Sequence, residues 1–278
     1  MKKKVAFVTC VQLGLSCIEE IYRIGGELDL LITLKDEKAK KKSGRIYLDE
    51  TASNYDTPLL KIDNINDIEV LDALKKHEID WLFIIGWSQI AKIDVLEAPS
   101  KGCIGMHPTL LPKGRGRAAI PWAILKGLDR TGVTMFKLDE GVDTGEIIGQ
   151  GIINLNESTT ATNLYEDVNR MHVDLISKYW EDIITDRVSL TKQDDTQATE
   201  WPGRTAKDGE VTSEMTMDEA EKLVRAVTHP YPGAFYVKDN KKTIIWSAKV
   251  DKENGSIKLV DGYLEPIDFE VETINEEQ

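Results

Sequence analysis

Short apolar runs and amphipathic stretches alternate along the first third of the chain. The predicted strands cover residues 4–10, 28–34 and 80–86, and the predicted helices cover 15–26 and 66–77. In the second helix Ile68, Leu71 and Leu74 form the expected buried face, and the polar residues 35–45 are expected to form a loop. The order β-α-β-α-β predicts an α/β fold with an open, mostly parallel, twisted sheet and helices on both faces. Ligands bind such sheets outside the carboxyl ends of the strands.

The later part of the chain changes character after about residue 200. Before that point we expect helices at 121–128 and 159–184, a strand at 131–138 and a strand pair at 146–155. Beyond it, Thr216 with Glu219 three residues later predicts a capping box at the start of another helix. A β-hairpin is expected around Asp239 and Asn240. We therefore predict a large domain over residues 1–205 and a small, mainly β domain over residues 206–278.

The acidic net charge of the chain argues against a nucleic-acid partner. The 278 residues carry a net charge of −13, and residues 251–278 alone hold nine acidic residues against two lysines. A protein that grips nucleic acid usually presents a basic surface, so we expect no nucleic-acid partner.

The cysteines and the apolar runs are typical of a cytoplasmic protein. The three cysteines form no CxxC pair, which argues against disulfides and a cysteine-based zinc site, and no metal is expected. The apolar run after the N-terminal lysines contains Gln12 and Gly14, so it predicts a first strand and not a signal peptide. No run of about 18 apolar residues occurs, so we expect a cytoplasmic protein with no membrane partner.

The segment GCIGMHPTLLPKGRGR, residues 102–117, holds the most distinctive candidate chemistry. His107 is followed by Pro108, which fixes the local backbone path. An imidazole held beside a strand end can act as a general base near neutral pH. The same sequence also suits a partly buried structural histidine, so this segment alone leaves both interpretations open.

Two further features could complete a site around His107. Asp143 follows 36 residues later in GVDTG, and its carboxylate could fix the tautomer of a nearby imidazole. An aspartate in such a turn often bonds its own backbone instead. Lys113, Arg115 and Arg117 alternate with glycines and suit phosphate or carboxylate groups, with a solvated basic edge as the alternative.

Three runs between residues 80 and 150 carry a resemblance to a known family. WLFIIGWSQI, GCIGMHPTLLPKGRGRAAIPWAILKG and TGVTMFKLDEGVDTGEIIGQ resemble the folate-dependent formyltransferases, which include methionyl-tRNA, glycinamide ribonucleotide and sugar N-formyltransferases. LVRAVTHPYPGAF and TIIWSA are similar to the C-terminal domain of the formyltransferase half of a bacterial enzyme that modifies lipid A with aminoarabinose. The resemblance implies a Rossmann-like catalytic domain over residues 1–205 and points to the sugar branch.

The resemblance also assigns roles to individual residues. It implies an enzyme that uses N10-formyltetrahydrofolate as formyl donor, with His107 as the catalytic base or acid and Asp143 as its partner. The folate would be held, largely through backbone groups, by Ile85, Gly86, Trp87, Ser88, Gln89, Leu138, Asp139, Glu140, Gly141 and Val142. Arg115 matches the arginine of the family's basic loop, and Arg117 matches a position shared with the lipid A enzyme. Together with Thr109, Lys113 and Arg204, these are the residues that we expect to bind the substrate.

A nucleotide-linked amino sugar, as used in polysaccharide biosynthesis, fits best as the acceptor of the formyl group. It needs a small anionic subsite, which the basic loop could supply, whereas the acidic chain disfavours transfer RNA. A formyl-folate hydrolase and a non-catalytic binder of folate or sugar nucleotide are the alternatives. Two copies of the chain could associate as a homodimer.

Gly105 departs from the family pattern. The family places an asparagine two residues before the histidine, where it helps to stabilise the oxyanion of the tetrahedral intermediate. Losing one such donor can cost on the order of 10²–10³ in rate. Ser88, Gln89, Thr109 or a water in the space beside the glycine are the candidates to replace it.

Overall fold

The computed structural model describes residues 2–39 and 45–273, and these form two compact units. Unit 1 comprises residues 1–115, 132–153 and 168–200. Unit 2 comprises residues 116–131, 154–167 and 201–278. Unit 2 thus includes two segments that precede residue 205, and the division into domains at residues 205/206 stays a prediction.

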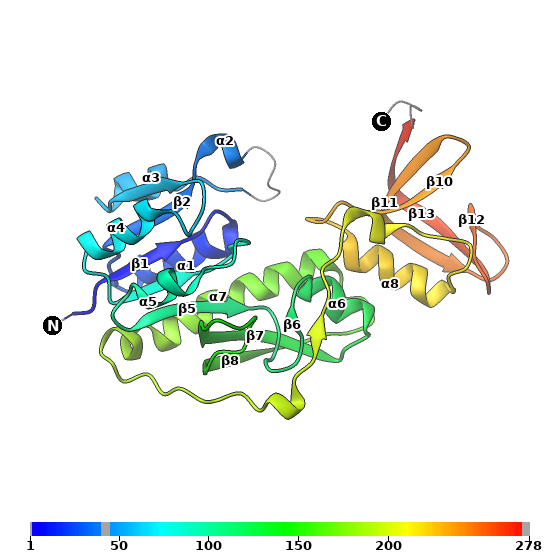
Figure 1. Cartoon of the computed structure of the whole chain (residues 1–278). Coiled ribbons are helices and arrows are strands. Elements are labelled where there is room, and N and C mark those ends of the chain that lie inside the picture. Colours follow the sequence, from blue (N-terminus) through cyan, green and yellow to red (C-terminus); the bar gives the residue numbers. More distant parts are fainter. Residues whose placement is uncertain (1, 40–44, 274–278) are drawn as a thin grey trace. The chain divides into compact units, whose positions relative to one another are not determined.

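Unit 1 is built on a seven-stranded sheet (Figure 1). Its strands, in the order β3-β2-β1-β4-β5-β7-β8, are β3 (Leu59–Ile62), β2 (Leu30–Leu34), β1 (Val5–Val8), β4 (Trp81–Ile84), β5 (Gly102–His107), β7 (Arg130–Lys137) and β8 (Ile147–Asn154). The pairs from β3 to β5 are parallel, and β7 runs antiparallel to β5. The predicted mostly parallel α/β sheet is confirmed. The strand order reverses at β1, so the crevice beyond the carboxyl ends of β1 and β4 is the expected ligand site.

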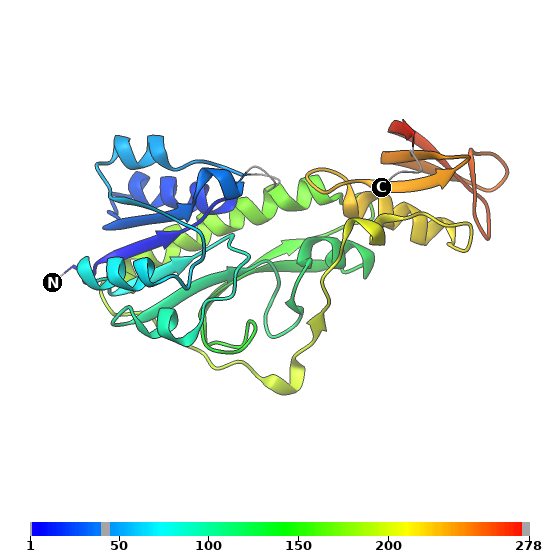
Figure 2. The ribbon, with the colours of Figure 1, turned by 45° about the horizontal axis from the view of Figure 1, so that its top comes forward.

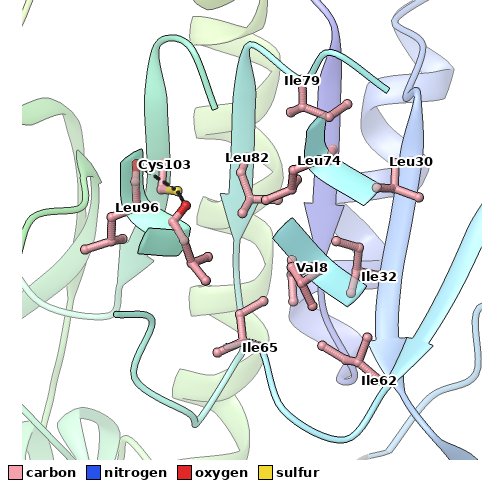
Figure 3. Packing of buried hydrophobic residues seen from close by; sticks show 13 residues of the cluster. Val8, Leu30, Ile32, Ile62, Ile65, Leu74, Ile79, Leu82, Leu96 and Cys103 are labelled. Atoms are coloured by element: carbon pink, nitrogen blue, oxygen red, sulfur yellow. Dashed lines mark hydrogen bonds between the residues drawn. The ribbon is translucent and has the colours of Figure 1, made fainter. Parts of the chain in front are cut away.

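Helices cover both faces of this sheet because successive side chains of a strand point to opposite faces. One face packs against α4 (Ile68–Lys76) and α5 (Ile93–Glu97), in a cluster that Figure 3 shows with Val8, Ile32 and Leu74. On the other face Phe7 stacks on Phe83, and Phe83 contacts Trp180 of α7 (Ala161–Ile184). The views in Figures 1 and 2 agree in placing α7 behind the strands. Ser177 of α7 donates a hydrogen bond to Glu20 of α1 (Gln12–Arg23).

Unit 2 contains a four-stranded antiparallel sheet. Its order is β10 (Ala234–Lys238), β11 (Lys241–Asp251), β13 (Tyr263–Thr273) and β12 (Ile257–Lys258). Asp239 and Asn240 join β10 to β11 with positive φ angles of 49° and 55°, which confirms the predicted hairpin. α8 (Met217–Val227) lies against β11 and begins with the predicted capping box between Thr216 and Glu219. It also contacts α6 (Ala119–Leu125).

The remaining elements are short. They are α2 (Asp36–Ala39), α3 (Asp49–Asn54), β6 (Arg115–Gly116), β9 (Glu200–Trp201) and the 3₁₀ turns Asp195–Gln197 and Ala206–Gly209. None of the described helices is long and apolar enough to cross a membrane.

Three local predictions were wrong. The stretch 35–45 contains α2, whose acidic first turn suits the helix dipole, while residues 40–44 lie outside the described part of the chain. Ile68 opens α4 and is 70% exposed, and Val70 is buried in its place. Residues 146–155 form a single strand because Gly149 and Gly151 lie directly beneath α7, where a Cβ would clash with Tyr179 or Met171. These glycines therefore permit close packing and make no turn.

His172, on the part of α7 that belongs to unit 1, is a buried titratable group. Its side chain is almost fully enclosed, and Nδ1 donates a 2.8 Å hydrogen bond to the carbonyl oxygen of Val168. Burial lowers the pKa of His172 from 6.5 to about 4, because the charged form loses its hydration. This neutral, enclosed state indicates a structural role for His172.

Protonation of His172 should make stability pH-dependent. Above pH 6.5 His172 is neutral in both the folded and the unfolded protein, and the folded state keeps its full stability. Below pH 6.5 the unfolded chain binds a proton at His172, whereas the folded protein binds one only near pH 4. The free energy of unfolding should therefore fall across this window by on the order of 3 kcal/mol. Urea unfolding from pH 7 to 4.5 should show a shallower fall for His172→Gln and the wild-type fall for the control His77→Gln. Equal falls in wild type and His172→Gln would contradict this account.

Candidate active site

His107 is the last residue of β5, at the carboxyl edge of the sheet. Gly105 pairs with Ile84 of the parallel strand β4. His107 and residues 85–89 therefore both lie at the carboxyl edge of the sheet. The ring is largely buried, and its Nε2 lies 2.8 Å from the carbonyl oxygen of Gly114. A carbonyl oxygen only accepts hydrogen bonds, so Nε2 must carry the proton. In the neutral ring, the lone pair able to accept a proton is then on Nδ1.

Asp143 lies close to Nδ1 of His107. Its Oδ2 is 3.5 Å from His107 Nδ1, with the two side chains 18% and 10% exposed. The turn that presents it is closed by Asp139, whose Oδ1 accepts hydrogen bonds from the Gly141 amide and the Thr144 hydroxyl. The carboxylate of Asp143 therefore lies within 3.5 Å of the ring nitrogen that carries the lone pair.

The loop that follows His107 is fixed by Thr134 of β7. Its hydroxyl donates to the Thr109 carbonyl oxygen at 2.7 Å and accepts from the Leu111 amide at 3.0 Å. The Gln150 amide donates to both the Thr134 hydroxyl and the Leu111 carbonyl oxygen at 2.8 Å. Both lone pairs and the proton of Thr134 are thus used, and the loop is held back against β7. The Thr109 hydroxyl is buried and has no hydrogen-bond partner among the described residues.

The three cations of the basic loop differ in environment. Arg115 is 7% exposed, and its guanidinium donates to Gln193 Oε1 at 2.8 and 3.2 Å and to Asp195 Oδ1 at 2.7 Å. Lys113 is exposed. The structure thus gives Arg115 internal bonds and leaves Lys113 open to solvent; the predicted role of both in substrate binding stays a prediction.

The other two predicted anion-binding residues, Arg117 and Arg204, belong to unit 2. Arg117 is exposed, and Arg204 is half-buried over the Trp122 ring, with 5.0 Å from its guanidinium carbon to the ring centroid. Arg204 also donates to the Asp208 carbonyl oxygen at 2.6 Å. The Cδ atom of Arg117 lies 3.6 Å from the position that a Cβ on Gly203 would take. Arg117 therefore lies beside Gly203, the residue directly before Arg204.

The residues predicted to hold folate lie on two segments of unit 1. Residues 85–89 follow β4 at the switch point, where Gly86 has a φ of +64° and passes so close to Val11 that a Cβ would clash. Trp87 is half-buried there, and Ser88 is exposed. Gln89 bonds the Ile65 amide and the Asp63 carbonyl oxygen, so its side chain is used in holding this segment. Leu138 is half-buried, and the segment 139–142 is exposed.

Leu138 fills the space beside Gly105. A Cβ built on Gly105 would lie 2.7 Å from Leu138 Cδ2, which is closer than van der Waals contact allows. The position next to Gly105 where the family carries the start of an asparagine side chain is thus occupied by a methyl group of Leu138. The Gln89 amide holds its own segment through two hydrogen bonds, whereas the buried Thr109 hydroxyl has no partner among the described residues.

Sequence reasoning missed Gln193, which links Arg115 to the turn that carries Asp143. It lies in the polar stretch TKQDDTQ, and no local pattern distinguishes it from its neighbours. Only the tertiary structure shows that it is buried.

Two sequence profiles of one family match the chain. Residues 25–179 match the profile described as formyl transferase, and residues 204–267 match the formyl transferase C-terminal domain. The first match alone covers more than half of the chain. The matches confirm the family resemblance and the expectation of an enzyme that transfers formyl groups.

Individual relatives differ in how much of them the chain covers. It is 28% identical over 242 residues to the bifunctional polymyxin resistance protein ArnA of Wigglesworthia glossinidia brevipalpis, covering 87% of this chain but only 36% of that protein. It is 26% identical over 249 residues to methionyl-tRNA formyltransferase of Lachnospira eligens, covering 89% and 79%. The N-formyltransferase of Helicobacter canadensis, solved with folinic acid and dTDP-3-aminofucose, superimposes with a TM-score of 0.73 at 20% identity, covering 98% and 99%. At this identity the last likeness concerns the fold alone.

The contact between Gly105 and Leu138 predicts a measurable coupling. Gly105→Ala should lower the free energy of unfolding by about 1–3 kcal/mol, because the new methyl group overlaps the Leu138 side chain. In a Leu138→Ala background the same change should cost clearly less, with a coupling energy of roughly 0.5–3 kcal/mol. Urea unfolding of the four proteins of this cycle measures it. Additive effects would show that Leu138 does not fill the space.

Proposed function

Because the chain belongs to the formyl transferase family, we propose that it moves a formyl group from N10-formyltetrahydrofolate to the primary amine of a nucleotide-linked amino sugar. The observation that carries the mechanism is the arrangement of His107, with Nε2 bonded to the Gly114 carbonyl oxygen and Nδ1 3.5 Å from Asp143. One ring nitrogen is thereby reserved for proton transfer.

His107 acts on the amine as general base. As the amine nitrogen bonds to the formyl carbon, its proton passes to Nδ1, and the imidazolium is stabilised by Asp143. When the bond between the formyl carbon and the donor nitrogen breaks, Nδ1 returns the proton to the departing nitrogen. The base therefore ends each cycle neutral. The Gly114 carbonyl keeps the ring in one orientation throughout.

The crevice at the switch point fits the folate donor, which supplies an activated formyl group. Gly86, with its left-handed backbone, allows residues 85–89 to turn closely past β1 beyond the end of β4. Trp87 offers half-buried aromatic surface at this edge. The backbone of this segment and the exposed residues 139–142 would hold the pterin ring.

Charge supports the sugar acceptor. The exposed Arg117 and the half-buried Arg204, both of unit 2, could bind the phosphates of a sugar nucleotide, while Arg115 keeps the loop in shape. The net charge of −13 opposes binding of a long polyanion such as transfer RNA. The Helicobacter canadensis enzyme, solved with a dTDP-amino sugar, supports this choice, whereas the relative from Lachnospira eligens makes methionyl-tRNA the acceptor to test against it.

A panel of acceptors tests the proposal directly. The protein with N10-formyltetrahydrofolate should formylate a member of a panel of UDP- and dTDP-linked amino sugars that includes dTDP-3-aminofucose, as detected by mass spectrometry. Formate release without any sugar would indicate the hydrolase, and binding without turnover would indicate a non-catalytic binder. Formylation of methionyl-tRNA alone would exclude the sugar acceptor.

Replacement of the proposed base tests the mechanism. His107→Ala should lower kcat for formyl transfer on the order of 10²–10⁴-fold, because the amine must then lose its proton to water. His77→Ala, at the end of α4, is the matched control and should retain wild-type kcat. Unchanged transfer in His107→Ala would eliminate His107 as the base.

A further inference from the structure

Gln193 is a buried amide within an exposed stretch. Its neighbours from Thr191 to Gln197 are all exposed, whereas Gln193 itself is 5% exposed. A buried polar side chain is costly unless every polar atom has a partner. Its partners therefore indicate why a glutamine occupies this position.

The two ends of the Gln193 amide have opposite partners. Oε1 accepts two hydrogen bonds from the Arg115 guanidinium, which can only donate. Nε2 donates to the carbonyl oxygens of Asp143 and Gly145, at 2.9 and 2.7 Å, which can only accept. If the amide were reversed, its NH₂ group would face the Arg115 donors and its oxygen would face two carbonyl oxygens. The hydrogen bonds therefore fix this orientation. Of the side chains of this length, only an amide offers an acceptor at one atom and two donors at the other.

The hydrogen bonds of Gln193 hold the residues next to both ring nitrogens of His107. Nε2 holds the backbone of the residue whose carboxylate lies 3.5 Å from His107 Nδ1. Oε1 holds Arg115, the residue directly after Gly114, whose carbonyl oxygen accepts the bond from His107 Nε2. Asp143 also has a left-handed φ of 55°, which an L-residue adopts only at a cost. A bond to its carbonyl oxygen helps to retain that backbone conformation.

We propose that Gln193 is a positioning residue that holds the Asp143 turn against His107, with Arg115 as its anchor. It touches neither the proposed donor nor the amine, so it acts through Asp143. This inference rests on the proposed roles of His107 and Asp143 in formyl transfer. It assigns to the buried Arg115 a part in catalysis that requires no contact with a substrate phosphate.

Two substitutions separate the two ends of the amide. Gln193→Glu keeps the size and the bonds to Arg115 but loses both donors to the Asp143 turn, and Gln193→Met loses both sets of bonds. Positioning of Asp143 predicts that both variants lower kcat, by roughly 10²-fold, because a displacement of about 1 Å at a reacting group can cost that much. The KM for the amino sugar should stay within about twofold of the wild-type value in Gln193→Glu, since that variant keeps the bonds to Arg115 and so leaves the basic loop in place. Wild-type kcat in Gln193→Glu would overturn the proposal.

A double-mutant cycle tests whether Gln193 acts through Asp143. The assay uses N10-formyltetrahydrofolate with the UDP- and dTDP-linked amino sugars of the panel above. In an Asp143→Ala background, Gln193→Glu should have little further effect on kcat. An undiminished loss in that background would show a general structural effect and overturn the proposal. Gln197→Glu, four residues away and exposed, is the matched control and should behave as wild type.

Hydrogen–deuterium exchange tests the anchoring without any assay of activity. The peptide spanning residues 139–146 should exchange faster in Gln193→Glu and Gln193→Met than in wild type, and at the wild-type rate in Gln197→Glu. Unchanged exchange in both Gln193 variants would overturn the proposal even if their activity fell. A wild-type protein that formylates no amine would instead refute the proposed function, and the exchange rates would still decide whether Gln193 anchors the turn.

Discussion

The hydrogen bond between His107 Nε2 and the Gly114 carbonyl oxygen is the constraint on which the site depends. This bond places the proton on Nε2 and the lone pair on Nδ1. The carboxylate of Asp143 therefore lies next to the ring nitrogen that can accept a proton. To make this bond, the chain must return to the imidazole only seven residues after leaving it. Thr134 and Gln150 hold the intervening loop on that path, so the neighbouring strands of the sheet orient the imidazole.

Much of the fold could be predicted because its signals are local. The alternation of apolar runs and helical spacing is enough for the parallel sheet, and a Thr-x-x-Glu pattern or an Asp-Asn turn marks a helix start or a hairpin without reference to the rest of the chain. The wrong prediction of a strand pair over residues 146–155 has the opposite cause. Whether a glycine turns the chain or accommodates a neighbour depends on α7, which follows later in the sequence.

The candidate site divides in the same way. The pairing of His107 with Asp143 was implied by the family resemblance, and the structure brings their side chains together. The burial of Arg115 could not be predicted, because the glutamine that accepts its hydrogen bonds lies 78 positions later in a polar stretch. Leu138 posed the same difficulty: nothing in its local sequence shows that it occupies the space beside Gly105. Residues that shape a site through long-range contacts carry no pattern of their own.

The alternation of burial along the basic loop has an evolutionary consequence. Arg115 is enclosed while Lys113 and Arg117 are exposed, so three cations that look equivalent in the sequence are under different constraints. A change at Arg115 would leave a buried glutamine and an aspartate without their donor. Changes at Lys113 or Arg117 would alter only what the surface presents to solvent. The loop can therefore vary at its outer positions while its inner position keeps the fold of the loop.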